Sequence, residues 1–574
     1  MSGTLRTRPH ASNARILVRT AREAARILPA LLIAGAGLVA ALDATTSHLG
    51  LLQPLPSLLP IDPDLSERLT AAFVATGLAG LAVGLARGKR FAWWLALGTL
   101  SAAVLAQVEA FQHVAGALLA ALCLLLLVVD RRHYRVQTGA SWGRAALVLW
   151  GIGTILAIGG LGVAVGQAAR IVHPAPSGDL GEDAVISWLA FGDPGYVVEH
   201  FVHGGLLLGL TLAARLAVVV GVIVALAPGD GPRAPADRER HVAQVAERFG
   251  LGALLPFQLA PETSRFSMGG VDAFIAYGRD GRVAIMLGDP IGEASQARAV
   301  LDGFLEWCAR SDWLPAVYQA SSSGLDTLHA RGFLTYRIGR EAVIDLGGFS
   351  LDGPQRANLR HTVARALRGG VRVEWYARGL GEAAGRMGSE LAAVDRAWRT
   401  TWRPQLGFTV SDFRLVDAVS QPVAVARDAH GRVIAFTTFR STGCDRGWVL
   451  DLIRRAPDGV PGAVEGCLVR AIEGFKQEDG AILSLGLAPL AGLTTSEGSP
   501  VERGLAVCAR LMRRSYDVSG LAFFKAKFDP RWEERYLAVP RRIDLPAVLL
   551  ALLRLHVGGS RGLLRAGWRL RAAD

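Results

Sequence analysis

The run Trp448-Val-Leu-Asp-Leu-Ile-Arg-Arg455, with the turn Ala-Pro-Asp-Gly-Val-Pro-Gly462 after it, identifies the fold class of the C-terminal half. An apolar strand ends on two arginines, and a loop of glycine and proline follows. Pro461 suits the first turn of a helix that we expect over 461–478. A further strand is predicted over 481–486. A strand, a loop, a helix and a strand in this order indicate an α/β fold.

The same alternation extends through the rest of the C-terminal half. Hydrophobic periodicity predicts helices at 237–249, 295–311, 354–368 and 382–398, and strands at 273–277, 283–287, 316–319, 342–345, 371–376, 423–427 and 433–440. The region is therefore predicted to be a soluble α/β region, and its two cycles suggest two similar halves.

The N-terminal part contains six apolar runs, at 27–49, 69–86, 91–108, 114–129, 145–168 and 201–227. Several approach the ~20 residues that a helix needs to cross a bilayer. Arginines precede the first run and fill the second and fourth connections, whereas the other connections are acidic. Because positive loops stay inside, this pattern predicts a multi-pass protein of the cell membrane with both termini in the cytoplasm.

Composition agrees with a chain of two parts. The 574 residues are 51% hydrophobic and 20% charged, with a mean hydropathy of +0.31, which is too apolar for a soluble protein and too charged for a purely membrane one. We divide the chain into a basic cytoplasmic N-terminus at 1–26, a membrane domain of about six helices at 27–227, a linker at 228–236 and a soluble remainder. The linker begins with the turn-rich sequence Pro228-Gly-Asp-Gly-Pro.

Charge and cysteine usage limit the function classes. The net charge of +12 favours anionic partners such as RNA or acidic lipid headgroups, although a solvated basic surface is the simpler explanation. The five cysteines are odd in number, scattered and without a C-x-x-C pair. They therefore indicate reduced core residues, with neither a disulfide framework nor a zinc site.

Asp451, Arg454 and Arg455 are the first candidate site. Free backbone N–H groups at the start of the 461–478 helix, together with the two arginines, would bind an anion. In acyl-CoA-dependent acetyltransferases a comparable loop holds pyrophosphate, but the spacing from Arg455 through Gly459 to Gly462 does not fit that pattern. The alternative is structural, in which Asp451 and Arg454 pair with each other or with neighbours.

Two further segments are rich in cations. Within 352–370, Arg356 and Arg360 share one helical stripe, and His361, Arg365 and Arg368 share another. Few acids balance these arginines, so they are candidates to bind phosphates, and a solvated helix face is the alternative. Within 521–540, aromatic and cationic residues are interleaved, and they would present Lys525, Lys527 and Arg535 to a phosphate.

The C-terminal tail, 546–574, combines an apolar run at 545–555 with Arg554, Arg561, Arg565, Arg569 and Arg571. A basic amphipathic segment of this kind would lie on an anionic membrane. Ordinary docking onto the domain is the alternative.

Several of these segments, in this order, resemble one known family, the aminoacyl-phosphatidylglycerol synthases, also called multiple peptide resistance factors or phosphatidylglycerol lysyltransferases. The resemblance covers about 248–540. Its motifs are Leu287-Gly-Asp-Pro-Ile-Gly292, Tyr336–Leu346, Gly407-Phe408 after the tryptophan-rich 398–402, Asp451–Arg455, Leu485–Leu490 and Phe524–Leu537. The membrane region is shorter than in members with a flippase, so the chain is similar to the short form of the family. Gln405-Leu406 stands where the family carries an acidic residue before the Gly-Phe pair.

This resemblance implies tandem acetyltransferase-like (GNAT) folds, the first at 237–350 and the second, catalytic one at 351–545. It implies transfer of a lysyl or similar aminoacyl group from aminoacyl-tRNA to the glycerol hydroxyl of phosphatidylglycerol at the inner leaflet. By the same resemblance, the product would lower the negative charge of the membrane and give resistance to cationic antimicrobial peptides. One ester replaces another, so the energetics require no ATP, metal or cofactor.

The resemblance and the residue types together suggest roles. Asp451 would bind the α-ammonium group or help proton transfer, and Arg454 would act with it at the catalytic centre. Arg454 and Arg455 would neutralise phosphate, since the guanidinium fork makes two hydrogen bonds. The lipid headgroup is assigned to Lys525, Lys527 and Arg535, and the tRNA acceptor end to Arg356, Arg360, Arg365 and Arg368.

Two other functions remain open at this point. One is a membrane-anchored N-acyltransferase that uses acyl-CoA, and the other is a lipid flippase or transporter with a regulatory cytoplasmic domain. The sequence leaves open which amino acid is transferred, whether the lipid is flipped, and whether the chain forms a homo-oligomer.

Overall fold

A computed structural model describes residues 28–35, 63–109, 114–131, 133–136, 139, 144–153, 155–156, 204–229, 236–400, 408–409, 412–443, 446–491 and 518–556. The chain forms two compact units. The first comprises Met1–Gly231 with Ala309–Asp312, and the second comprises Pro232–Cys308 with Trp313–Asp574.

The first unit contains the helices α2 (Pro63–Ala86), α3 (Arg90–Glu109), α4 (Val114–Val129) and α8 (Gly204–Ala225). These helices coincide with four of the predicted apolar runs. Among the described residues, however, no helix combines the length and the apolarity that crossing a membrane requires. The six predicted crossings therefore find no support there, and most of the runs at 27–49 and 145–168 lies outside the described residues.

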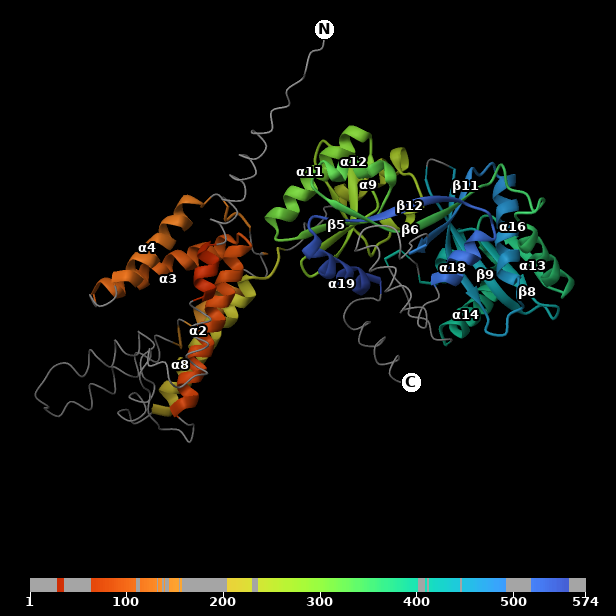
Figure 1. Cartoon of the computed structure of the whole chain (residues 1–574). Coiled ribbons are helices and arrows are strands. Elements are labelled where there is room, and N and C mark those ends of the chain that lie inside the picture. Colours follow the sequence, from red (N-terminus) through yellow and green to blue (C-terminus); the bar gives the residue numbers. More distant parts are fainter. Residues whose placement is uncertain are drawn as a thin grey trace, which may run out of the picture. The chain divides into compact units, whose positions relative to one another are not determined.

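The second unit is built on one continuous sheet (Figure 1). Its strand order is β1-β2-β3-β5-β12-β6-β11-β10-β9-β8-β7, with β4 paired to β2. The strands are β1 (Ser264–Ser267), β2 (Ala273–Asp280), β3 (Val283–Leu287), β4 (Ile291–Gly292), β5 (Leu314–Ala320), β6 (Leu334–Asp345), β7 (Arg372–Tyr376), β8 (Val423–Arg427), β9 (Val433–Ser441), β10 (Trp448–Arg455), β11 (Ile482–Pro489) and β12 (Arg531–Val539). The predicted α/β fold of this half of the chain is thus confirmed.

Helices cover both faces of this sheet. They are α9 (Ala236–Phe249), α10 (Leu255–Gln258), α11 (Ala294–Arg310), α12 (Leu325–His329), α13 (Ala357–Arg368), α14 (Ala384–Thr400), α15 (Leu415–Ser420), α16 (Ala463–Gln477), α18 (Val518–Ala526) and α19 (Leu545–His556). In the half of the sheet that contains β2, β3 and β5, α11 packs against one face through Phe304. In the same half, α19 packs against the other face through Val548. In the second half, α16 and α14 occupy opposite faces through Phe475 and Leu391.

The C-terminal strand joins the two halves. β12 pairs antiparallel with both β5 and β6, although it follows the whole second half in the sequence. The segment 521–540 therefore divides into a helix, α18, and a strand, whereas the sequence showed no clear periodicity there. β6, the longest strand, in turn pairs with β11. Glu341, Ser484 and Arg535 lie on β6, β11 and β12 of this central part of the sheet.

Candidate active site

Asp451 occupies an irregular position in the middle of β10. The antiparallel pairing of β10 with β9 shifts between Leu450 and Leu452, so Asp451 is the extra residue of a bulge. Its side chain is only 2% exposed, and its Oδ2 accepts a hydrogen bond from Nε of Arg440 at 3.0 Å. Its Oδ1 is buried and has no hydrogen-bond partner among the described residues. The carboxylate is therefore held in place through Oδ2, whereas Oδ1 is left without a partner from the described residues.

Arg440 positions this carboxylate from the neighbouring strand. Its Nη2 donates a hydrogen bond to Oδ2 of Asp417 on α15 at 3.0 Å, and its Nε donates the hydrogen bond to Asp451. Arg414 in turn donates to Asp417 at 3.0 Å. The carboxylates of Asp417 and Asp451 thus hold the Arg440 guanidinium between them. This arrangement limits how far the Asp451 side chain can move.

The strands next to Asp451 part from each other. β10 and β11 are parallel but pair only at Trp448↔Leu483 and Val449↔Ser484. Both strands continue well beyond these pairs, to Arg455 and to Pro489. The Asp451 bulge thus lies just after the point at which the ladder between β10 and β11 ends.

A second polar cluster surrounds Glu341 on β6. Glu341 is 3% exposed. Its Oε1 accepts a hydrogen bond from Oγ of Ser484 at 2.5 Å, and its Oε2 accepts one from Nε of Arg535 at 2.7 Å. Ser484 is the residue paired with Val449, two positions before Asp451. The two clusters therefore lie on adjacent strands of the central sheet.

Lys525 on α18 is buried beside this cluster. Its side chain is 4% exposed, and its Nζ donates to the carbonyl oxygens of Gly486 at 3.0 Å and Leu487 at 2.8 Å. Burial lowers the pKa of Lys525 to about 7, although the charge of Glu341 raises it slightly. A neutral amine has two N–H groups, and both are occupied here.

The carbonyls that hold Lys525 come from an irregular part of β11. The pairing of β11 with β6 shifts between Ser484 and Leu487. Gly486, which lies inside this shift, has φ +77°, a conformation that favours glycine. The local irregularity turns two backbone oxygens toward Nζ.

Buried ion pairing gives a direct test of the Glu341 cluster. The side chains of Glu341 and Arg535 are 4% and 14% exposed. Glu341→Gln places an amide donor against the guanidinium, so we expect the free energy of unfolding to fall by about 3 kcal/mol. Glu533→Gln, which removes the half-buried second partner of Arg535, is the matched control and should cost less than about 1 kcal/mol. Urea unfolding of both variants measures the difference, and equal losses would contradict the central role of Glu341.

The structure places Arg454 and Arg455 in different surroundings. Nε of Arg454 donates to Oδ1 of Asp395 on α14 at 2.7 Å, and its guanidinium lies 4.0 Å from the ring centre of Trp398. Arg455 is exposed. Asp451 and Arg454 thus pair with neighbours rather than with each other.

The start of α16 is also less open than the anion-site prediction requires. Gly462, its N-cap, has φ +94°. A Cβ at this position would lie 2.7 Å from the Thr362 carbonyl oxygen of α13. The helix start therefore packs closely against α13, and Arg454 points to α14 instead.

The remaining predicted cations fall into two groups. Lys527 pairs with Glu465 at 2.9 Å, Arg356 donates to the Ser350 carbonyl at 2.9 Å, and Arg360 donates to the Leu351 carbonyl at 2.6 Å. These three cations therefore contact a carboxylate or backbone carbonyl groups of the protein itself. Arg365 and Arg368, in the last turn of α13, are exposed and are accessible to a ligand.

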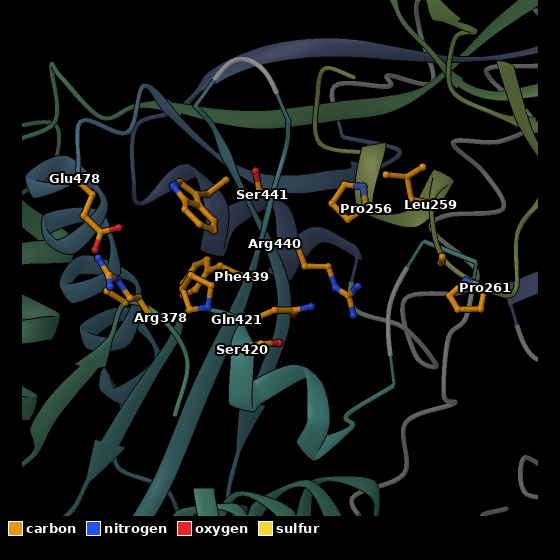
Figure 2. Close-up of a pocket in the computed structure, with 14 residues that line it drawn as sticks. Pro256, Leu259, Pro261, Arg378, Ser420, Gln421, Phe439, Arg440, Ser441 and Glu478 are labelled. Carbon is orange, nitrogen blue, oxygen red and sulfur yellow. The ribbon is translucent and has the colours of Figure 1, made fainter. Parts of the chain in front are cut away.

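A cavity of about 600 Å³ lies beside the Asp451 cluster (Figure 2). It is lined by Pro256, Leu259, Ala260, Pro261, Ala377, Arg378, Ser420, Gln421, Pro422, Phe439, Arg440, Ser441, Trp448 and Glu478. Figure 2 shows the Arg440 side chain between Gln421 on one side and Pro261 on the other. Arg440 therefore links the cavity directly to Asp451. None of the cations predicted from the sequence lines this cavity.

Sequence reasoning missed Arg440, Asp395, Glu341 and Ser484. Arg440 carried a usable signal, because it is a charged residue in a strand that is otherwise largely apolar. Glu341 carried little, since its strand contains three other charged residues. Asp395 and Ser484 carried none, since an aspartate on a helix and a serine in a strand are common.

Comparison with known proteins places this site in context. Residues 254–539 match the family model described as "Phosphatidylglycerol lysyltransferase, C-terminal". The phosphatidylglycerol lysyltransferase of Bacillus subtilis is 27% identical over 329 residues, which cover 57% of this chain and 38% of that protein. The lysylphosphatidylglycerol biosynthesis bifunctional protein LysX of Mycobacterium leprae is 28% identical over 507 residues, or 83% of this chain and 43% of that protein. The chain spans less than half the length of these curated relatives.

A solved structure is also similar to part of this chain. The C-terminal domain of a protein described as a lysylphosphatidylglycerol synthetase from Agrobacterium fabrum is 28% identical and has a TM-score of 0.49. The match covers 57% of this chain and 98% of that domain.

Proposed function

Because this chain belongs, through residues 254–539, to the phosphatidylglycerol lysyltransferase family, we propose that it transfers a lysyl or similar aminoacyl group from aminoacyl-tRNA to a glycerol hydroxyl of phosphatidylglycerol. The observation that carries this proposal is Asp451, a buried carboxylate with one oxygen unpaired among the described residues, whose partner Arg440 lines a cavity of about 600 Å³. An aminoacyl ester presents a free α-ammonium group, and a fixed carboxylate is its natural partner.

The reaction exchanges one ester for another. The lipid hydroxyl oxygen attacks the aminoacyl carbonyl carbon, and the bond from that carbon to the tRNA ribose oxygen breaks. The hydroxyl proton leaves the lipid and ends on the ribose oxygen. In our assignment Asp451 binds the ammonium group, and the lone pair of neutral Lys525 accepts the hydroxyl proton and returns it to the leaving oxygen. Lys525 thus takes a different role from the headgroup contact that the sequence suggested.

The roles of the other cations follow from their exposure. We assign the tRNA acceptor end to Arg365 and Arg368, which are exposed on one helix, and phosphate neutralisation to Arg455. Arg535 and Arg454 are positioning residues, because each is held by a buried carboxylate. Arg356, Arg360 and Lys527 hold the surrounding loops, and in this assignment they support the site without touching substrate.

Fold and location complete the proposal. We assign the two halves of the sheet as acetyltransferase-like folds, and the divergence of the parallel strands β10 and β11 supports this for the second half. Since the acceptor is a membrane lipid, we place the reaction at the inner leaflet of the cell membrane. The multi-pass arrangement with cytoplasmic termini stays a prediction from the arginine distribution.

Donor identity separates this proposal from the acyl-CoA alternative. The purified chain is mixed with phosphatidylglycerol vesicles and, in separate reactions, with each radiolabelled aminoacyl-tRNA, and the lipid is then extracted. We expect label in the lipid from one or a few aminoacyl-tRNAs, and loss of that label after ribonuclease treatment. If ribonuclease has no effect while acetyl-CoA is consumed, the chain is an acyl-CoA enzyme. If neither donor is consumed, the transferase proposal fails.

A further inference from the structure

Helix α19 leaves an apolar face uncovered. Leu545, Val548 and Ala551 are buried against the sheet. On the other side of the helix, Leu550 and Leu553 are 45% and 48% exposed. Figure 1 shows α19 lying along one side of the sheet. The helix therefore docks on the domain, which was one of the two alternatives that the sequence left open for this segment. Only one face of the helix is buried by this docking.

The short 3-10 helix before α19 extends this face. Ile543, in η3 (Arg542–Asp544), is 80% exposed. Ile543, Leu550 and Leu553 together are called the α19 face below. Large aliphatic side chains on the surface of a compact unit cost free energy in water, and they commonly mark an interaction site.

Positive charge borders the α19 face. The Arg541 side chain is 71% exposed, and Arg542 is exposed beside it. Within the described residues 541–556 there are three arginines and one aspartate. Aliphatic residues bordered by arginines match an anionic bilayer, in which the aliphatic groups enter the headgroup boundary and the guanidinium groups meet lipid phosphates.

We propose that the α19 face is a docking surface for an anionic lipid bilayer, and that it holds the catalytic unit against the membrane that contains its acceptor. The identity of the acceptor rests on the proposed function, whereas the surface itself does not. RNA is a poorer fit, because bases stack on aromatic rings and the α19 face carries aliphatic side chains. A protein partner would not require the surrounding positive charge.

The first test compares two forms of the acceptor. The full-length double variant Leu550→Glu/Leu553→Glu is assayed with phosphatidylglycerol in vesicles and with a short-chain, water-soluble phosphatidylglycerol. We expect the ratio of the vesicle rate to the soluble rate to fall about tenfold. Val416→Glu changes an apolar residue that is 68% exposed on α15 and should leave this ratio unchanged. An unchanged ratio in the double variant overturns the proposal.

The second test does not depend on activity. Leu553→Cys and, as control, Val416→Cys are labelled with an environment-sensitive fluorophore in a full-length background without native cysteines. Brominated lipids in vesicles of phosphatidylglycerol and phosphatidylcholine should quench position 553 and not position 416, and pure phosphatidylcholine should quench position 553 less. Equal quenching at both positions, or protection of position 553 by tRNA in place of lipid, overturns the surface. If transfer fails with both acceptors while position 553 is quenched, the proposed function is wrong and the surface stands.

Discussion

Asp451→Asn is expected to lower the rate of aminoacyl transfer by about a hundredfold, because a hydrogen bond between charged groups contributes roughly 1.5–3 kcal/mol and every 1.36 kcal/mol changes a rate tenfold. Asparagine keeps the shape of the side chain and can still accept from Arg440. It loses the negative charge that would bind the substrate ammonium group at the unoccupied Oδ1. Initial rates with aminoacyl-tRNA and phosphatidylglycerol vesicles measure the effect.

Asp417→Asn is the matched control for this substitution. Asp417 holds the other side of the same Arg440 guanidinium, at 3.0 Å, but it is not the bulged residue of β10. We expect its rate to fall less than about tenfold, since it acts only through Arg440. Thermal unfolding of both variants shows whether they fold. Equal losses of rate in folded protein would mean that Asp451 only positions Arg440.

Lys525 predicts a particular pH dependence. Its amine must be neutral to accept the hydroxyl proton, and burial lowers its pKa to about 7. The rate of transfer should therefore rise as the pH increases through about 7, then level off. Lys525→Met keeps most of the side-chain length and removes the base, so we expect a loss of about a hundredfold and no rise of the residual rate near pH 7. A rate that instead falls above pH 7 would show that charged Lys525 is the active form.

The pH dependence of thermal unfolding tests the lowered pKa of Lys525 independently of activity. Below pH 7 the lysine is protonated in both the folded and the unfolded chain, and burial of the charge destabilises the fold. Between about 7 and the ordinary value of 10.5, only the unfolded chain holds the proton, so stability rises with pH. The wild-type chain should gain thermal stability from pH 6 to pH 8 relative to Lys525→Met. A parallel pH dependence of the two unfolding midpoints would argue against a buried lysine with a lowered pKa.

Local elements of the second unit were predictable because each depends on a short run of residues. β3 and β8 have the predicted limits, Val283–Leu287 and Val423–Arg427, since an apolar run of β-branched and small residues between turn signals has few alternatives. α9, α11, α13 and α16 begin within a few residues of the predicted positions for the same reason. β6 was predicted only in its second part, because Gly339, Arg340 and Glu341 interrupt its apolar pattern.

The structure of segment 521–540 could not be predicted from its own residues. Its first part forms α18, which buries Lys525 against β11, and its second part forms β12 between β5 and β6. Neither placement follows from the composition of the segment, because the partners of β12 lie about two hundred residues earlier in the chain. Pairing between distant strands is decided by the whole sheet.

The candidate site was predictable only in part for the same physical reason. The sequence alone proposed Asp451 and Lys525 as candidates, together with the family motifs that contain them, because a carboxylate in an apolar strand and cations among aromatics are visible in short runs. The tertiary structure decided their partners: Arg440 and an unoccupied oxygen for Asp451, and two backbone carbonyls for Lys525. Burial and hydrogen-bond geometry, which set charge state and reactivity, depend on strands that meet only when the chain is folded.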